Sequence, residues 1–249
     1  MLKRISLAIG LGMATLATPS LALDLSEMTP QERANFGEQV REYLMENPQV
    51  IIDAVNSLEQ RQAEIQAQAD FDLVAQNASD LFDDGFSYVG GNPDGDITLV
   101  EFMDYRCGFC KRAFGEIEKL LEEDGNIRFV VKEFPILGEQ SVVASRYVIA
   151  TKMIEGAEAY KSLHDALMAY NGDISLPALR RLANTFGLDS DSIEARMNDE
   201  DVTDEIRETR ALAQRLQING TPTFVLHDEM LRGFLPSDQL QQIIEDKRS

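Results

Sequence analysis

Cysteine is scarce in this chain, whose 249 residues include only Cys107 and Cys110. Exported proteins commonly use several disulfides as covalent cross-links, and two cysteines separated by two residues cannot supply such a framework. A disulfide between them would close a very short loop, which removes little entropy from the unfolded chain. The pair therefore indicates thiol chemistry rather than structural cross-linking.

Ligands for a metal ion are equally scarce. A structural zinc site needs about four ligands, and the chain adds only His164 and His227 to its two cysteines. A site of two cysteines and two histidines is the alternative, but the two histidines lie in different segments without ligand spacing. We expect no metal site, with His164 on an amphipathic helix and His227 at the end of a strand.

Positive charge is also in short supply. The chain has 23 Lys and Arg against 43 Asp and Glu, which gives a formal net charge of −20. This balance argues against nucleic acid or an anionic membrane surface as a partner. It favours a well-solvated acidic surface.

The apolar run at the N-terminus is short. Lys3 and Arg4 precede it, residues 5–17 form it, and Ser20 and Ala22 supply small side chains before a cut after Ala22. This order is typical of a cleaved secretory signal peptide. The run is shorter than the ~20 residues that span a bilayer, which counts against a membrane anchor. We therefore expect export, with residues 1–22 as the signal peptide.

Residues 23–78 are expected to be helical. Thr29-Pro30-Gln31-Glu32 combines a capping threonine, a proline at the first helical position and a glutamate three residues after the cap. Asn47-Pro48 predicts a break between two helices. Apolar residues follow helical spacing on both sides of it: Phe36, Val40 and Leu44, then Ile51, Val55 and Leu58. Two such helices leave apolar stripes uncovered, so we expect self-association, with packing on the chain's own main domain as the alternative.

Residues 79–249 are expected to form the main domain, of the α/β class. Strands are predicted over 87–91, 97–103, 127–134, 223–227 and 230–234, with helices over 107–123, 138–217 and from 236. The first strand–helix–strand unit implies a parallel pair with a right-handed crossover. The pattern predicts a small mixed sheet with a helical insertion, residues 138–217, between its two halves.

The two cysteines lie where a buried strand ends and a helix begins. Unpaired N–H groups and the positive end of a helix favour a thiolate at Cys107. Cys110, one turn inside the helix, is expected to be shielded and to resolve the mixed disulfide that Cys107 forms with a substrate. Gly108 and Phe109 are expected to contact that substrate, with a plain spacer role for Phe109 as the alternative.

Basic residues surround the cysteines in an otherwise acidic chain, namely Arg106, Lys111 and Arg112. One unit charge at about 6 Å contributes roughly 3 kcal/mol at an effective dielectric constant of about 20, before screening by solvent. The cluster is expected to lower the pKa of Cys107. The alternative is that these side chains point into solvent, away from the sulfur.

Two motifs resemble those of a known family. Residues 100–110, VEFMDYRCGFC, resemble the active-site strand and helix of DsbA-type thioredoxin-fold proteins, and residues 219–224, NGTPTF, resemble their loop before the fourth strand. The helices of residues 23–78 resemble the oligomerisation segment of Com1-like and ScsC-like periplasmic proteins. The resemblance implies a thioredoxin-like fold, a periplasmic location, no organic cofactor, and a membrane redox partner that recycles the dithiol.

The resemblance also implies roles for single residues. Pro222 would form a cis peptide bond opposite the dithiol, and Thr221 would present its backbone to a substrate; an ordinary trans proline is the alternative. A carboxylate inside a strand covered on both faces is anomalous unless it is paired or functional. Glu101 is such a residue, and the family's buried acid, which assists proton transfer from the resolving cysteine, would fall on it. Lys132 is the expected partner that tunes Glu101, with solvent-facing side chains as the alternative for both.

The chain departs from the most oxidising family members, which have Pro-His between their cysteines, because it has Gly108-Phe109. This departure favours a less oxidising dithiol, suited to isomerisation or reduction. The sequence predicts a protein-disulfide oxidoreductase or isomerase that acts on unfolded or misfolded exported proteins. The alternative of another class is an envelope chaperone or copper-handling protein that binds through the same thiols, although the methionines form no ligand cluster.

Overall fold

The computed structural model describes residues 28–249, so the expected signal peptide, residues 1–22, lies outside the described part. The chain divides into two compact units, one ending at Glu59 and one formed by Gln60–Ser249. Within residues 28–249, no helix combines the length and apolar character needed to cross a membrane.

Both helices predicted for the N-terminal segment are present and begin within the first unit. α1 (Pro30–Glu46) begins after Thr29, whose hydroxyl accepts a hydrogen bond from the Glu32 backbone N–H while the Glu32 carboxylate accepts one from the Thr29 backbone N–H. The chain turns at Asn47, and α2 (Gln49–Gln76) follows and continues into the second unit. Along α1, all of which the structure describes, no side chain is buried.

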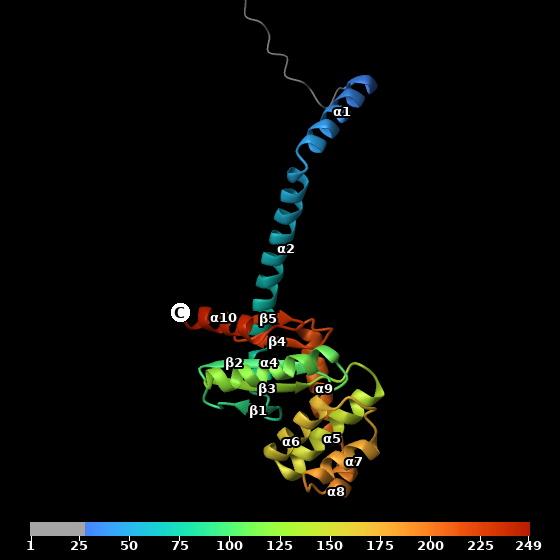
Figure 1. Cartoon of the computed structure of the whole chain (residues 1–249), viewed down its shortest axis with the longest axis vertical. Helices are drawn as coiled ribbons and strands as arrows, with labels where there is room; N and C mark the ends of the chain where they lie inside the picture. Colours follow the sequence, from blue (N-terminus) through green and yellow to red (C-terminus); the bar gives the residue numbers. More distant parts are fainter. Residues whose placement is uncertain (1–27) are drawn as a thin grey trace, which may run out of the picture. The chain divides into compact units, whose positions relative to one another are not determined.

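The second unit is built on one five-stranded sheet (Figure 1). Its strands are β1 (Tyr88–Gly91), β2 (Ile97–Met103), β3 (Ile127–Glu133), β4 (Thr223–Leu226) and β5 (Glu229–Arg232), in the spatial order β1-β3-β2-β4-β5. β2 and β3 are parallel and are connected through α4 (Gly108–Asp124), while the other three pairs are antiparallel. The expected mixed sheet is therefore confirmed.

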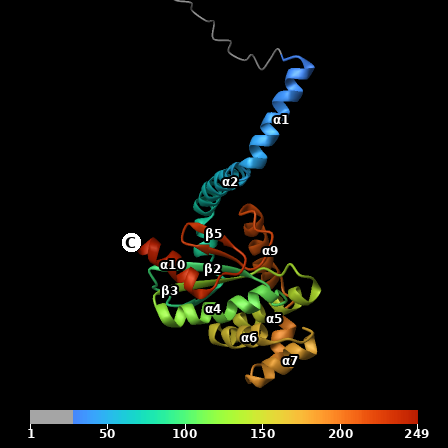
Figure 2. The same ribbon diagram turned by 45° about the horizontal axis from the view of Figure 1, so that its top comes forward.

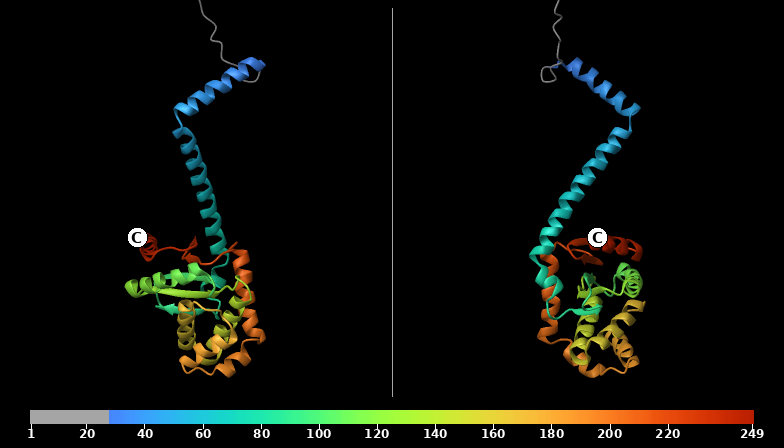
Figure 3. Two further views of the ribbon diagram at one scale, coloured as in Figure 1. Left: turned by 45° about the vertical axis from the view of Figure 1, so that its right-hand side comes forward. Right: turned by 90° about the vertical axis from the view of Figure 1, so that its left-hand side faces the viewer.

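Helices fill the interval between β3 and β4. They are α5 (Glu139–Glu155), α6 (Ala157–Ala169), α7 (Leu176–Thr185), α8 (Ser190–Arg196) and α9 (Glu200–Arg215). α5–α8 gather in one group, and α9 leads the chain back along the sheet to β4 (Figure 3). Two further helices, α3 (Ala78–Phe82) and α10 (Ser237–Arg248), precede and follow the sheet. The expected helical insertion is confirmed, and its helices lie between Glu139 and Arg215.

Helices cover both faces of the central strands (Figure 2). The α4 face carries Leu99 and Met103 and packs in one hydrophobic cluster with α4, α5, α6 and α10. The α9 face carries Val100 and Phe102 and packs in a second cluster with α2, α3 and α9. Strands buried on both faces have near-continuous apolar sequences, so a charged side chain within β2 or β3 is necessarily removed from water.

Lys132 is one such charge, and it is fully buried on the α9 face. Its ammonium group donates hydrogen bonds to the Asp84 carboxylate at 2.5 Å and to the Asp80 carbonyl at 2.8 Å. Burial raises the pKa of Asp84, but the charge and hydrogen bond of Lys132 outweigh it, so the net shift is downward. This buried ion pair holds the segment after α3 against β3.

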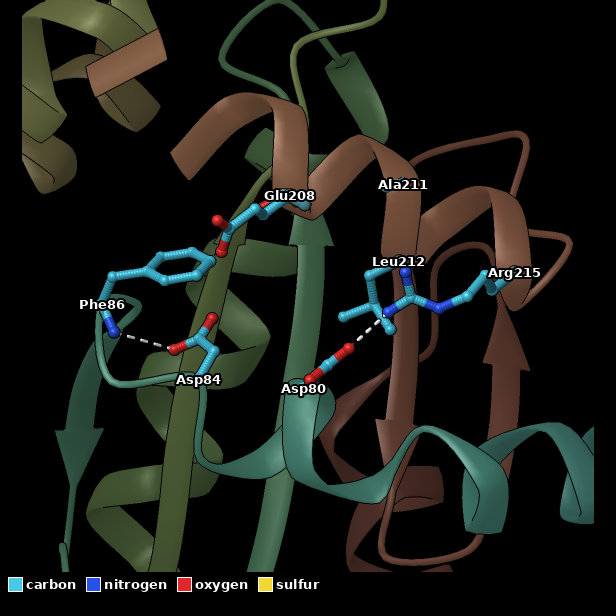
Figure 4. Close-up of a pocket in the computed structure, with 8 residues that line it drawn as sticks. Asp80, Asp84, Phe86, Glu208, Ala211, Leu212 and Arg215 are labelled. Carbon is cyan, nitrogen blue, oxygen red and sulfur yellow. Dashed lines mark hydrogen bonds and ion pairs between the residues drawn. The ribbon is translucent and has the colours of Figure 1, made fainter. Parts of the chain in front are cut away.

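A pocket of about 170 Å³ lies beside this connection (Figure 4). The segment from α3 to Phe86 lines one side of it, and α9 lines the other. Arg215 of α9 crosses the gap to pair with Asp80 at 2.5 Å. The contact is an additional link between α3 and α9 rather than part of the dithiol site.

Candidate active site

Cys107 occupies the N-cap of α4, where the chain leaves β2 and turns into the helix. An N-cap side chain accepts a hydrogen bond from a backbone N–H of the first turn, usually through oxygen. Here the acceptor is sulfur, because the Cys110 N–H donates to the Cys107 Sγ atom at 3.3 Å. The helix start therefore directs its unpaired N–H groups at the first cysteine, as the sequence predicts.

The loop before β4 lies against the same sulfur. The Thr221-Pro222 peptide bond is cis, and the Cys107 Sγ atom lies 3.1 Å from the Thr221 carbonyl oxygen. Residues separated by more than a hundred positions are thus in direct contact. The structure brings together Cys107, Cys110, Thr221 and Pro222, as expected from the two motifs.

The two sulfur atoms differ sharply in acidity. The pKa of Cys107 falls to about 5, chiefly because of a hydrogen bond with the Cys110 side chain. Burial acts in the opposite direction and raises the pKa. Hydrogen bonds with the Thr221 side chain and with the backbone N–H groups of Cys110 and Phe109 lower it further. Burial raises the pKa of Cys110, and its hydrogen bond with Cys107 and the charge of Glu101 raise it further. At neutral pH the site holds one thiolate and one thiol.

The basic residues around the dithiol contribute differently from the expectation. Lys111 donates its ammonium hydrogen bond to the Tyr170 carbonyl, and the Arg112 guanidinium lies 5.5 Å from the ring centroids of Phe109 and Phe234. None of the basic side chains is among the main causes of the low pKa of Cys107. The expectation that the cluster produces this shift is wrong, because hydrogen bonds to sulfur produce it.

Glu101 lies on the α4 face of β2 and is only 3% exposed. Its pKa rises to about 8, first because of burial, then because of the negative charges on Cys107 and Glu133. Among the described residues, its Oε1 atom has no hydrogen-bond partner. The carboxyl group is therefore mainly protonated at neutral pH, and it lies on the sheet face whose hydrophobic cluster includes both cysteines.

The expected pair between Glu101 and Lys132 is wrong. In the parallel ladder, Glu101 is opposite Val131, whereas Lys132 is opposite Phe102. Because side chains alternate between the faces of a sheet, a difference of one residue places them on opposite faces. Lys132 is paired with Asp84 instead.

Asp104 is a buried residue of the site that the sequence analysis did not identify. Its carboxylate accepts hydrogen bonds from the backbone N–H groups of Arg106 at 2.7 Å, Ile136 at 2.8 Å and Leu137 at 3.0 Å. These contacts join the turn before Cys107 to the loop after β3. Its place directly after an apolar strand and three residues before a cysteine was the available signal.

Glu133 was also missed. This buried residue ends β3 and accepts hydrogen bonds from three hydroxyl groups, those of Tyr105, Ser145 and Tyr160. A carboxylate that closes an otherwise apolar strand, VVKE, was the signal in the sequence. Its partners could not be identified there, because two of them lie in the helical insertion.

The surface at the dithiol is open. Gly108 is exposed, and a side chain built at this position would meet nothing within 4 Å. Phe109 is 57% exposed, and the neighbouring loop presents Ile136 and Leu137. Among residues 28–249, no group of three or more His, Cys, Asp or Glu side chains is arranged to hold a metal ion.

We predict that the Cys107 thiol of the reduced protein titrates near pH 5. The rate of alkylation by iodoacetamide should rise through a midpoint near that pH and level off by neutral pH, because the thiolate is the nucleophile. Cys110→Ala should raise the midpoint, since it removes the largest cause of the shift. Cys110→Ser, which keeps a hydroxyl donor, should raise it less. A midpoint above pH 8 in the unmodified protein, or equal midpoints for all three proteins, would contradict this account.

Several solved structures are similar to the chain. A thioredoxin-like oxidoreductase from Silicibacter pomeroyi DSS-3 is 41% identical, with a TM-score of 0.65 over 69% of this chain and 98% of that one. The thiol-disulfide exchange protein alpha-DsbA2 from Wolbachia pipientis is 25% identical, with a TM-score of 0.67 over 72% and 96%. Proteus mirabilis ScsC in a transitional conformation is 26% identical, with a TM-score of 0.64 over 90% and 98%.

Curated sequences match over part of their length. The Na(+)/H(+) antiporter NhaA 1 of Mycobacterium sp. (strain KMS) is 28% identical over 167 residues, which cover 65% of this chain. The chain spans about a quarter of that relative, 27%.

Two family descriptions match the sequence itself. Residues 32–64 match the copper resistance protein ScsC N-terminal domain. Residues 98–245, which hold both cysteines and the cis proline, match the DSBA-like thioredoxin domain. This second match covers more than half of the 249 residues, and the chain therefore belongs to the DSBA-like thioredoxin domain family of thiol–disulfide oxidoreductases.

Proposed function

We propose that this chain is a periplasmic oxidoreductase that forms, reduces or isomerises disulfides in exported proteins through Cys107 and Cys110. The unequal acidity of the two sulfur atoms, beside a cis proline, is the observation that carries the proposal. A dithiol that exchanges disulfides needs one thiolate that attacks the substrate and one thiol that later resolves the mixed disulfide. The N-terminal sequence, with its expected signal peptide, supports export.

The exchange would proceed through a mixed disulfide. The Cys107 thiolate attacks a substrate disulfide, forms a bond to one substrate sulfur and releases the other as a thiolate. Cys110 then loses its proton and attacks the Cys107 sulfur, which frees the second substrate sulfur as a thiolate. The substrate has gained two electrons, and the dithiol has become a disulfide. The reverse sequence oxidises a substrate, and a membrane redox partner would reset the dithiol in either case.

Glu101 would take the proton that Cys110 loses, because the mixed disulfide removes the Cys107 charge that helps to keep Glu101 protonated and so lowers the pKa of its carboxyl group. Burial keeps Cys110 protonated, so its attack needs a base in the same water-excluded cluster. A general base works best when its pKa is near the operating pH, and the pKa of Glu101 is about 8. The unpartnered Oε1 atom leaves this carboxyl group free to exchange a proton.

The substrate would lie along Thr221, beside the cis proline and across from Cys107. An extended peptide can bind by backbone hydrogen bonds at such a loop. Gly108 leaves room for it, and the exposed Phe109 ring offers an apolar contact. These two features suit an unfolded chain, whose apolar side chains are accessible.

The first unit would join copies of this chain. Its two helices expose a series of large apolar side chains: Phe36, Val40, Tyr43, Ile51, Ile52, Val55 and Leu58. Contiguous exposed apolar surface of this kind marks an interaction site. A homo-oligomer would cover it, and it would also hold several dithiols around one misfolded substrate, which suits isomerisation.

We predict that Cys107→Ala abolishes turnover in insulin reduction and in the reactivation of scrambled ribonuclease, since the remaining Cys110 sulfur is buried and keeps its proton. Cys110→Ser should still form the mixed disulfide but release it slowly, and trapped adducts on gels would report this. A parent protein that shows no turnover, yet prevents aggregation or binds Cu(I) through both thiols, would favour the chaperone or copper-handling alternative.

We predict that Glu101 makes the stability of the reduced protein depend on pH. Its folded pKa of about 8 lies above its ordinary value of 4.5, so its contribution is complete below pH 4.5 and is lost as the pH rises through about 8. Relative to Glu101→Gln, the unfolding free energy of the unmodified protein should fall by up to roughly 5 kcal/mol across this window. Urea denaturation of both reduced proteins between pH 4.5 and 9 measures this, and a constant difference would contradict it.

We predict that the exposed apolar side chains of α1 and α2 hold the oligomer together. The double variant Ile51→Glu/Val55→Glu should be monomeric by light scattering, because it places charges in the interface. Ser57→Glu, an exposed polar position on the same helix, is the matched control and should keep the mass of the unmodified protein. A monomeric unmodified protein would refute self-association. As a control for folding, the rate of Cys107 alkylation should be the same in the unmodified protein and in both variants.

A further inference from the structure

A buried polar network surrounds Glu133, which is 6% exposed. One carboxylate oxygen accepts from the Tyr105 hydroxyl at 2.7 Å and from the Tyr160 hydroxyl at 2.8 Å. The other accepts from the Ser145 hydroxyl at 2.6 Å. Three donors that converge on one carboxyl group fit its ionised form, which only accepts hydrogen bonds.

His164 completes the network. Its Nδ1 atom lies 3.0 Å from the Tyr105 oxygen, and burial lowers its pKa to about 3, so the ring is neutral. Because Tyr105 uses its single proton toward Glu133, the Nδ1 atom of His164 must carry the proton that it shares with the tyrosine oxygen. The ring therefore supports Tyr105 as a donor to Glu133.

The network connects the dithiol turn to the helical insertion. Tyr105 lies two residues before Cys107, between β2 and α4, whereas Ser145 belongs to α5 and Tyr160 to α6. Tyr105 and Tyr160 are fully buried. Neither hydroxyl takes part in the exchange steps proposed above, so their role is to hold the Glu133 carboxylate in place.

Glu133 and Glu101 lie on the same face of the sheet. In the parallel ladder, Glu133 is opposite Met103, and Glu101 is opposite Val131. The two glutamates are thus diagonal neighbours on adjacent strands, since residues two positions apart share a face. Like charges in a low-dielectric interior disfavour each other's ionisation.

We propose that Glu133 is a positioning residue for the thiol chemistry, which holds the turn before Cys107 against the insertion and keeps a negative charge beside Glu101 so that Glu101 retains its proton. The inference rests on the proposed function in one respect, namely that Glu101 exchanges its proton with Cys110. The helices of the insertion thereby act on the dithiol through Glu133, by donating two of the hydrogen bonds that keep it charged.

Other charged and titratable groups also surround Glu133. Burial raises the pKa of Glu133, and the hydroxyl donors and the charge of Lys152 on α5 oppose that effect without cancelling it, so the net shift is upward. Lys152 pairs with Glu205 of α9 at 2.9 Å, so its charge is shared. On the β1 side, the Tyr88 ring stacks on Tyr160 with centroids 4.6 Å apart. The charge of Glu133 in turn contributes to the raised pKa of Glu101.

The test is the titration of Glu101, followed by carbon-13 NMR of its carboxyl group in the reduced protein and assigned with Glu101→Gln. Glu133→Gln keeps the size of the side chain and removes its charge. It should lower the Glu101 midpoint from near 8 by about one pH unit, a tenfold change in proton affinity. The pH at which Cys110 resolves a mixed disulfide should shift in parallel. An unchanged midpoint would overturn the proposal.

Tyr160→Phe is the matched control. It removes one of three donors, and Tyr105 and Ser145 still hold the Glu133 charge, so the Glu101 midpoint should stay near that of the unmodified protein even where stability falls. If Glu133→Gln does not fold, the unmodified protein decides, because the Glu101 resonance should show a second, lower inflection where Glu133 loses its proton. A single inflection would refute the coupling. Neither titration needs turnover, so a failure here is distinct from a failure of the proposed exchange activity.

Discussion

The parallel pairing of β2 with β3 is the constraint on which the site depends. It aligns Glu101 with Val131 and Met103 with Glu133, and so fixes which charged side chains share a face. The carboxyl ends of both strands lead into the site: β2 runs into the turn before Cys107, and β3 runs into the loop that Asp104 holds. A slip of one residue would move every side chain to the other face and would place Lys132, rather than Glu133, beside Glu101.

Burial then makes the two sulfur atoms unequal. Cys107, at the helix start, receives hydrogen bonds that outweigh the cost of desolvating its charge, and its pKa falls to about 5. Cys110, one turn inside, is buried without comparable compensation, and its pKa rises. The same helix thus produces a nucleophile and a shielded partner, because the supply of unpaired N–H groups ends after the first turn.

The sequence predicted the features that follow from local rules. The capping box at Thr29, the helix start at Cys107 and the parallel strand pair depend on residues close in the chain, and each was found. The partner of Lys132 was missed, because Asp84 lies in an irregular segment that no periodicity places against β3. The cause of the low pKa of Cys107 was also misjudged, since charge near in sequence was favoured over hydrogen bonds that depend on geometry. The hydroxyl partners of Glu133 were beyond reach, because tertiary packing of the insertion brings them there.

The hydrogen bonds of Glu133 explain why the location of the insertion matters for the site. Its helices are inserted between β3 and β4, so α5 leaves from the end of β3 that carries Glu133. Ser145 and Tyr160 reach back to that carboxylate, while Tyr105 reaches it from the dithiol turn. A shift of α5 or α6 would withdraw donors from a buried charge, which costs more than the same change in water. Movement of the insertion and the proton affinity of Glu101 are therefore coupled through one carboxylate, that of Glu133.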